Sequence, residues 1–258
     1  MGDTVFHWTT RDATPEGAID VSSYGSSPYN TYSPFTLHST PAIPIPGRER
    51  ERACSVEGIW QGLKQVHGGI NEHFFTRKPK KIRARIEGHQ FGKHLLGIVD
   101  ARLHIYVPAY VFHVINTALP PTAETLKQLV ETGGSITLYD VEDNNDIRNP
   151  DTAYSHASLL ADTLNTLWNS PLPPWNKRPF DDLESQLDAT LNYRETLNPW
   201  NRKIIDDSLT FAYLYSGDPL RETFALRFIK TGINDLGRLE HYSPSQTTQP
   251  IFAELFKR

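Results

Sequence analysis

The longest uncharged stretch of the chain, Leu103 to Ala123, limits the possible folds more than any other segment. A run of this length is long enough to cross a bilayer as a helix. It contains two histidines and an asparagine, however, and the pair Pro120–Pro121 lies near its end. These polar and helix-breaking residues favour a buried helix of a soluble domain, which opens at Pro108 and closes before the proline pair.

The other segments predict an α+β protein that is rich in helix and has a few short strands. Residues 1–47 are rich in Ser, Thr, Tyr, Pro and Gly, a composition typical of loops and short strands. Residues 135–141 (SITLYDV) alternate and form the clearest strand, with Ile136, Leu138 and Asp140 on one side. Apolar spacing and caps at Ser55, Thr122 and Ser155 predict helices over 55–67, 79–98, 109–119, 122–132 and 155–168.

The composition changes at Ser170, where PLPPWNKRPF has the character of a stiff linker. Beyond it we expect helices near 181–194, 202–215 and 219–231, and a short last helix. The chain therefore divides into a core of residues 1–170 and a helical extension of residues 171–258.

Composition excludes several classes of protein. Of 258 residues, only Cys54 is a cysteine, which excludes a disulfide framework and a multi-cysteine zinc site. No metal-ligand spacing, phosphate-binding loop or dinucleotide fingerprint is present, so we expect neither a metal nor a cofactor. The N-terminus lacks the pattern of a signal or transit peptide, so we expect a cytoplasmic protein without a membrane partner. The sequence leaves the oligomeric state open.

Charge is unevenly distributed along the chain. The net charge is −4, but residues 48–94 hold 11 Lys/Arg against 5 Asp/Glu, a local +6 that leaves −10 for the remainder. A basic block within an acidic chain can be a site for phosphates or an ordinary solvated face.

The predicted helix over 55–67 carries the clearest chemical pattern. Glu57, Gln61 and Lys64 stand at i, i+4 and i+7, so they form one stripe beside the apolar stripe. A carboxylate, an amide and an amine at the edge of a buried face lose water, which shifts their pKa values toward useful chemistry. The alternative is a boundary salt bridge between Glu57 and a lysine or arginine.

Tyr32-Ser33-Pro34-Phe35 followed by Ser55-x-Glu57-x-x-x-Gln61-x-x-Lys64 resembles the NADAR (YbiA-like) family over about residues 20–168. Trp60 stands at an aromatic position of that motif. The segments 80–92, 129–132 and 155–165 are similar to later family segments. Three departures suggest a distant subfamily. Pro34 replaces the usual Asn, Ser55 stands one residue further from Glu57 than usual, and the family's Asp-x-x-Trp-Gly motif is missing where residues 139–146 stand.

The resemblance implies an N-glycosidase, a hydrolase that cleaves the C1′–N bond of a nucleotide-like or ADP-ribosylated-base substrate. Glu57 would act as general base or stabilise an oxocarbenium-like sugar. Lys64 would attack C1′ or hold Glu57 or a phosphate, and Gln61 would orient sugar hydroxyls. A second carboxylate would come from Asp140, Asp143 or Asp146, of which we choose Asp146.

Other residues near these motifs are candidates for substrate contact, although His89 and His156 read more readily as hydrogen-bonded structural histidines, and Tyr32 and Phe35 as core residues. For contact with base or sugar the candidates are Tyr32, Ser33, Phe35, Trp60, Arg85, His89 and Asp143; for phosphate they are Lys80, Lys81 and Arg83.

Two other functions stay open. One is a DNA glycosylase that excises a modified base and leaves an abasic site, which would suit phage–host conflict. The other is a nucleotide-binding module without catalysis.

Overall fold

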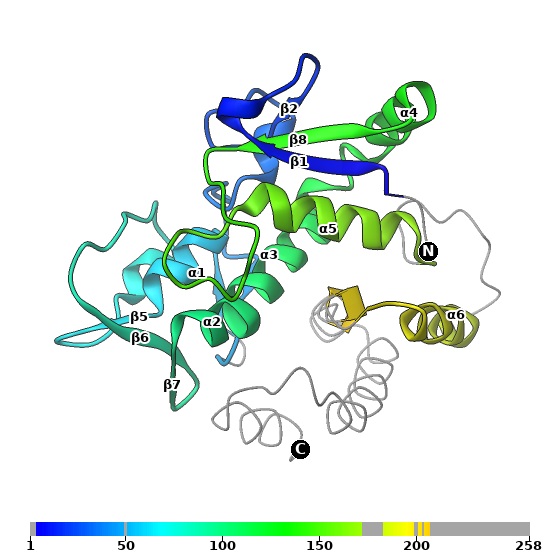
Figure 1. Ribbon diagram of the computed structural model, residues 1–258. Coiled ribbons are helices and arrows are strands. Elements are labelled where there is room, and N and C mark those ends of the chain that lie inside the picture. The colour runs from blue at the N-terminus through cyan, green and yellow to red at the C-terminus, as the bar shows by residue number, and fades with distance from the viewer. Residues whose placement is uncertain (1–3, 49–50, 172–182, 199–200, 203, 207–258) are drawn as a thin grey trace.

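The computed structural model describes residues 4–48, 51–171, 183–198, 201–202 and 204–206 (Figure 1). Within them helices and short strands mix, which confirms the predicted α+β class. Most of the predicted linker and the predicted helices over 202–215 and 219–231 and at the C-terminus lie outside the described residues, apart from 202 and 204–206, which are helical.

A small parallel sheet forms one layer of the molecule (Figure 1). Its strands are β1 (Phe6–Thr10), β2 (Ile19–Asp20) and β8 (Ile136–Asp140), with β8 in the centre. The predicted strand over 135–141 is confirmed, because Ile136, Leu138 and Asp140 alternate toward the buried side. The carboxyl ends of parallel strands share one edge, so the end of β8 at Asp140 faces the part of the fold where α/β sheets commonly hold ligands.

Helix α5 (His156–Trp168) packs beneath this sheet and begins at the predicted cap, where Ser155 Oγ accepts a hydrogen bond from Ser158 N (3.4 Å). The side chain of Asn165 ties the helix to β1. Its Nδ2 donates to Phe6 O (2.7 Å), and its Oδ1 accepts from the Val5 and Phe6 amides (both 2.9 Å). The helix α6 (Leu183–Glu195) confirms the predicted helix near 181–194.

The uncharged run forms a buried core helix, as predicted, but the helix is longer than expected. It runs over Ile98–Ala118 and comprises α2 (Ile98–Ala101), a π-helical segment Arg102–Tyr106, α3 (Val107–His113) and a second π-helical segment Val114–Ala118. Of its most apolar stretch of 18 residues, 78% is buried inside the protein. Pro108 lies inside this helix rather than opening it. The wider π-helical turn just before it makes room for the proline ring, which would otherwise clash with a backbone carbonyl, and accommodates the lost N–H hydrogen bond.

Helix α4 (Ala123–Gly133) begins after Thr122 and stops before Gly134, whose φ of +76° suits glycine. The predicted helix over 122–132 is therefore confirmed. The Thr122 hydroxyl does not cap it, however. It donates to Ala118 O (3.0 Å) and contacts the Tyr32 hydroxyl instead.

The predicted helix over 55–67 is too long. Helix α1 covers only Val56–Gly62, and Lys64 already belongs to β5 (Lys64–Val66). A Cβ at Gly62 would overlap the Phe75 ring, so the helix packs tightly against the 3-10 turn Glu72–Phe75 and the chain then turns away.

The predicted helix over 79–98 is wrong. Residues 76–85 form an irregular loop, followed by a hairpin of β6 (Ile86–Phe91) and β7 (His94–Leu96), which extends β5 into an antiparallel sheet. Gly92, with φ of +57°, sits in the two-residue turn between the strands. Ile82 and Ile86 suggested a helical stripe, but Ile86 is 39% exposed.

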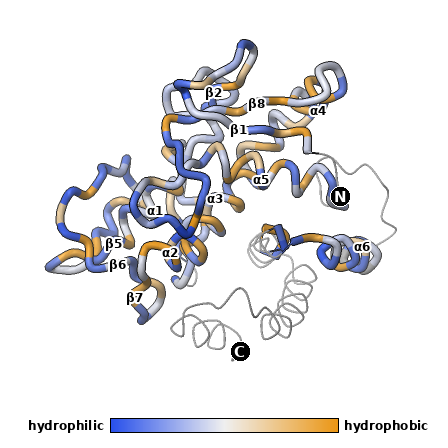
Figure 2. The backbone as a smooth tube through the Cα atoms, in the orientation of Figure 1, coloured by the Kyte–Doolittle hydropathy of each residue, from blue (hydrophilic) through white to orange (hydrophobic). Residues whose placement is uncertain are grey.

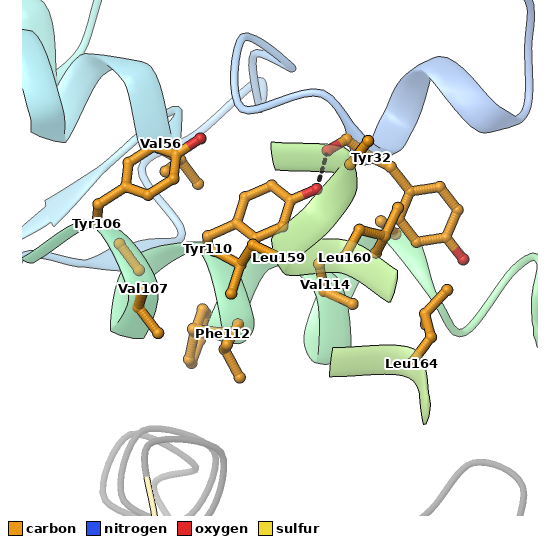
Figure 3. Packing of buried hydrophobic residues seen from close by; sticks show 14 of the residues in the cluster. Tyr32, Val56, Tyr106, Val107, Tyr110, Phe112, Val114, Leu159, Leu160 and Leu164 are labelled. Atoms are coloured by element: carbon orange, nitrogen blue, oxygen red, sulfur yellow. Dashed lines mark hydrogen bonds between the residues drawn. The ribbon is translucent and has the colours of Figure 1, made fainter. Parts of the chain in front are cut away.

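Residues 4–47 form loops and short strands, as predicted for this region. Besides β1 and β2, they contain 3-10 turns at Arg11–Ala13 and Tyr29–Tyr32 and the strand β3 (Ile43–Pro44), which pairs with β4 (Arg52–Ala53). The hydrophobic core lies where the long helix crosses α5 and receives Tyr32 from this N-terminal region (Figure 3).

Candidate active site

Glu57 and Gln61 lie one turn apart on α1 and are both buried. Ser55 caps the helix by accepting from Gly58 N (3.0 Å), and Glu57 N donates to Pro34 O (2.9 Å). The Gln61 amide Nε2 donates to Glu57 Oε1 (2.7 Å), while its Oε1 accepts from Ile82 N (3.0 Å). Gln61 therefore connects the carboxylate to the irregular loop of residues 76–85, named here the basic loop.

Burial raises the pKa of Glu57 above its usual value. The hydrogen bond from Gln61 and the positive charges of Lys64, Lys81 and His156 oppose this rise without cancelling it. A carboxyl group whose pKa is shifted toward neutrality is suited to accept and return a proton.

Lys64 joins this group from β5, not from the helix as predicted. It is buried, it stands opposite His89 in the β5–β6 register, and its Nζ lies 5.9 Å from the centre of the Trp60 ring. Burial lowers the pKa of Lys64, the charge of Glu57 opposes this, and the charge of Lys81 adds to it. The structure thus brings Glu57, Gln61 and Lys64 together, although by a helix-to-strand turn rather than by one stripe.

Trp60 stands in a stack of rings beside these groups. The His89 ring lies 4.0 Å from it at an interplanar angle of 30°, and Tyr106 meets it edge-on at 5.5 Å. Both ring nitrogens of His89 are buried without a hydrogen-bond partner among the described residues, so the interpretation as a hydrogen-bonded histidine is wrong. Burial, with the charges of Lys64 and Arg102, lowers the pKa of His89 to about 3, which keeps the ring neutral.

The second buried carboxylate is Asp140, at the end of β8. Its Oδ2 lies 2.6 Å from His156 Nδ1, and the other ring nitrogen of His156 lies 2.9 Å from Val21 O. His156 therefore hydrogen-bonds Val21 O and makes a close ion-pair contact with Asp140, although Asp140 Oδ2 has no hydrogen bond of good geometry among the described residues. Burial alone would lower the pKa of His156 and raise that of Asp140, but their mutual bond and charges reverse both directions. The interpretation of His156 as a hydrogen-bonded structural histidine is confirmed.

The structure does not bring Asp146 to Glu57. Asp146 and Asp143 are both exposed, and Asp146 Oδ1 accepts from Arg148 N (2.9 Å) within its own turn. The charge of Asp146 acts on Arg102 instead. Asp146 therefore lies outside the buried group because the turn folds outward after the strand ends, and of the three candidate aspartates only Asp140 is buried.

Arg102, which the sequence reasoning missed, holds that turn in place. Its buried guanidinium donates to the carbonyls of Ile147 (3.1 Å), Thr152 (2.6 Å) and Asn149. In Figure 1 the turn after β8 passes in front of α1 and α2 on its way to α5. A charge directly before the long uncharged run was the only signal for this role.

Two of the predicted aromatic-motif residues are structural. Tyr32 is 1% exposed, and its hydroxyl lies 2.5 Å from Thr122 Oγ1, so its ring is not available for stacking on a base. Ser33 is also buried, and its Oγ accepts from Phe35 N (3.2 Å). Phe35 itself is half-buried and adjoins Pro34, whose carbonyl binds the Glu57 amide.

The basic loop lies at the rim of this group and protrudes on the side of β6 in Figure 1. Its cations are exposed, and its tube is largely hydrophilic in Figure 2. Lys81 Nζ lies 4.0 Å from Glu142 Oε1, which joins the loop to the turn after β8. The predicted phosphate-binding and substrate-binding cations on this loop are Lys80, Lys81, Arg83 and Arg85.

These features define an α+β domain in which α1, β5, β6 and the carboxyl end of β8 surround a buried carboxyl group. No cluster of three or more His, Cys, Asp or Glu side chains suited to a metal occurs in the described part of the chain. The chain belongs to a family of unknown function, DUF6939, whose match covers residues 8–160 and hence every site residue named above. No curated protein and no solved structure matches the chain significantly.

Proposed function

We propose that this chain is an N-glycosidase that hydrolyses the C1′–N bond of a nucleotide-like or ADP-ribosylated-base substrate. The observation that carries the proposal is the Glu57 carboxyl group, which is buried, has a raised pKa and is held by Gln61 with Lys64 and Lys81 close enough to act on it. The sequence resemblance to the NADAR family, centred on these same residues, adds to it.

In the proposed reaction Glu57 takes a proton from the water that attacks C1′. The C1′–O bond forms, the C1′–N bond breaks, and its electron pair stays on the departing nitrogen. Glu57 then returns the proton to that nitrogen, so atoms and charge balance. Before the proton moves, the ionised carboxylate also stabilises the positive charge that develops on the sugar.

Lys64 offers a second route to the same products. Its lowered pKa increases the share of neutral amine, which can attack C1′, displace the base and form an imine after the sugar ring opens. Water then releases the sugar from Lys64. Reduction by borohydride traps the imine, so a covalent adduct that forms with the wild type and not with Lys64→Ala would support this route.

The test is direct. The full chain is incubated with an ADP-ribosylated guanine nucleotide, and free guanine nucleotide is measured by mass spectrometry. Release by the wild type and its loss in Glu57→Gln supports the proposal, with Asp151→Asn, also on the exposed segment after β8, as the matched carboxylate control. If the wild type releases no base from any N-ribosylated nucleotide offered, or if Glu57→Gln and Lys64→Ala both keep full activity, the proposal fails.

A modified base within DNA is the second candidate substrate, and the basic loop favours it. From residue 77 to 85 the loop contains six cations and no acid, all of them exposed. Cations spread along an extended segment suit successive phosphates of a strand better than one phosphate group. Abasic sites in modified DNA, revealed by alkaline cleavage and absent with Glu57→Gln, would favour this substrate, as would a steep salt dependence of DNA binding.

A further inference from the structure

Three tyrosines with buried rings lie in or against the long helix, and their hydroxyl groups differ in whether they form hydrogen bonds within the protein (Figure 3). The Tyr110 hydroxyl donates to Tyr32 O (2.8 Å), and the Tyr32 hydroxyl meets Thr122 Oγ1 (2.5 Å). The Tyr106 hydroxyl makes no hydrogen bond to any residue that the structure describes. In Figure 3 it lies beside Val56, and its ring runs parallel to that of Tyr110.

The ring of Tyr106 is held in place by its neighbours, so side-chain mobility does not explain why its hydroxyl forms no hydrogen bond. It is 8% exposed, it stacks on Tyr110 with centroids 5.9 Å apart, and it meets Trp60 edge-on at 5.5 Å. Tyr106 also ends the π-helical segment Arg102–Tyr106. Such a turn holds an extra residue and re-aims the side chains at its end, and π-helical turns are frequent at functional sites.

The hydroxyl lies among the site's acidic groups. The negative charges of Glu57 from α1, of Asp140 from β8 and of Glu142 from the following turn all act on it, together with Tyr154. Burial first, and then these charges, raise the pKa of Tyr106, so it remains a protonated donor at any physiological pH.

The Tyr106 hydroxyl is not among the fully buried polar atoms that lack a partner in the described part of the chain, so it keeps some accessible surface and can meet a ligand. A phenylalanine here would fill the same space but would offer that ligand no donor. We infer that the Tyr106 hydroxyl is a catalytic group of the proposed glycosidase, donating a hydrogen bond to an acceptor atom of the substrate that lies against Glu57. This inference rests on the proposed function.

The departing base is the acceptor that would benefit most. As the C1′–N bond breaks, electron density moves onto the base, and a donor fixed beforehand binds this state more strongly than the ground state. No proton needs to leave Tyr106, so the proton balance of the proposed reaction is unchanged.

Tyr106→Phe, Tyr110→Phe and Tyr32→Phe form a matched set, because each removes one hydroxyl from a buried ring. Tyr110→Phe and Tyr32→Phe should each lose about 0.5–1.5 kcal/mol of unfolding free energy in urea. Tyr106→Phe should lose none, because its hydroxyl has no hydrogen-bond partner in the described part of the chain. A loss in Tyr106→Phe equal to that in Tyr110→Phe would overturn the inference without any assay of activity.

With the ADP-ribosylated guanine nucleotide, Tyr106→Phe should lower kcat about 100-fold, as removal of one fixed donor does, and Tyr110→Phe should leave kcat near the wild-type value. Wild-type kcat and KM in Tyr106→Phe, while Glu57→Gln is inactive, would overturn this inference and leave the proposed function standing. If the wild type cleaves nothing, the proposed function fails, and calorimetric binding of ADP-ribose decides the role of Tyr106. Weaker binding by Tyr106→Phe then supports a ligand contact, and unchanged or absent binding refutes it.

Discussion

Asp140 and Glu57 are two buried carboxyl groups of one domain, and they meet different partners. Asp140 lies in close ion-pair contact with the His156 ring (2.6 Å), and the other nitrogen of that ring bonds Val21 O, so Asp140 has a charged partner at contact distance. Among the described residues, Glu57 has a single neutral side-chain hydrogen-bond donor, Gln61, and cations only at longer range. The pKa of Asp140 is lowered and that of Glu57 is raised. A buried carboxylate with a charged partner at contact distance stabilises a fold, whereas one without such a partner is available to a substrate.

The largest effect should follow from Glu57→Gln. We expect the rate of base release to fall by about 10²- to 10⁴-fold, because proton transfer by a positioned side chain is lost. The unfolding free energy should rise instead, by roughly 0.5–2 kcal/mol, the range of common stabilising substitutions. Urea unfolding and single-turnover kinetics measure the two. If this variant loses stability, the Glu57 carboxylate contributes to the fold as Asp140 does, and the proposed difference between the two groups is wrong.

Asp140→Asn should have the opposite effect on stability and lower the unfolding free energy. Removing one partner of a buried ion pair leaves an uncompensated charge and costs about 3–5 kcal/mol. Urea unfolding measures this loss, and the exposed Asp143→Asn should stay within about 0.5 kcal/mol of the wild type. Equal stabilities of the two variants would show that the Asp140–His156 pair contributes nothing to the fold.

The two groups should also differ in how stability depends on pH. The lowered pKa of Asp140 contributes stability above its ordinary value of 3.8, and this is lost as pH falls through the folded-state pKa. The raised pKa of His156 contributes stability below its ordinary value of 6.5, lost as pH rises through the folded-state pKa. The unfolding free energy of the wild type should therefore exceed that of Asp140→Asn/His156→Gln most between about pH 4 and 6.5.

Glu57→Gln gives the reverse pattern, because the raised pKa of Glu57 costs stability only where the unfolded carboxyl is ionised. Its gain in unfolding free energy should be absent below the ordinary value of 4.5 and should grow as pH rises above it. Urea titrations of the three proteins from pH 4 to 8 measure both trends. A gain for Glu57→Gln that is largest at pH 4 would contradict the assignment.

The smallest effect should come from Lys81→Gln. The Lys81–Glu142 contact is exposed at both ends, so its loss should change the unfolding free energy by less than about 0.5 kcal/mol. The charge of Lys81 lowers the pKa of Glu57, so removing it should move the acid limb of the pH–rate profile to higher pH. Lys78→Gln, on the same loop, is the control and should leave the profile in place.

Elements whose signals are local could be predicted from the sequence. The cap at Ser155, the alternation over 136–140 and the proline pair after the long helix each specify a boundary through neighbouring residues alone. The end of α1 could not be predicted, because it depends on Gly62 meeting Phe75, a contact between separate segments. The hairpin at Gly92 did have a local signal, a glycine in a two-residue turn, which the apparent stripe of Ile82 and Ile86 outweighed.

The candidate site divides in the same way. Glu57 and Gln61 are one helical turn apart, so their hydrogen bond follows from spacing. Asp140 and His156 belong to different elements, and Tyr106 lies at the end of a π-helical segment of the long helix. Sequence spacing specifies neither relation, so it does not distinguish the buried Asp140 from the exposed Asp146.

The bond from the Ile82 amide to Gln61 Oε1 gives the site a built-in reporter. Gln61 holds Glu57 with its other end, so a molecule that draws the Gln61 amide toward itself must lengthen or break the bond to Ile82. A single backbone amide, observed by its chemical shift or its exchange with deuterium, would then register occupancy before any reaction is known. Ligand libraries could be screened against this one signal, with no assumption about which bond the protein cleaves.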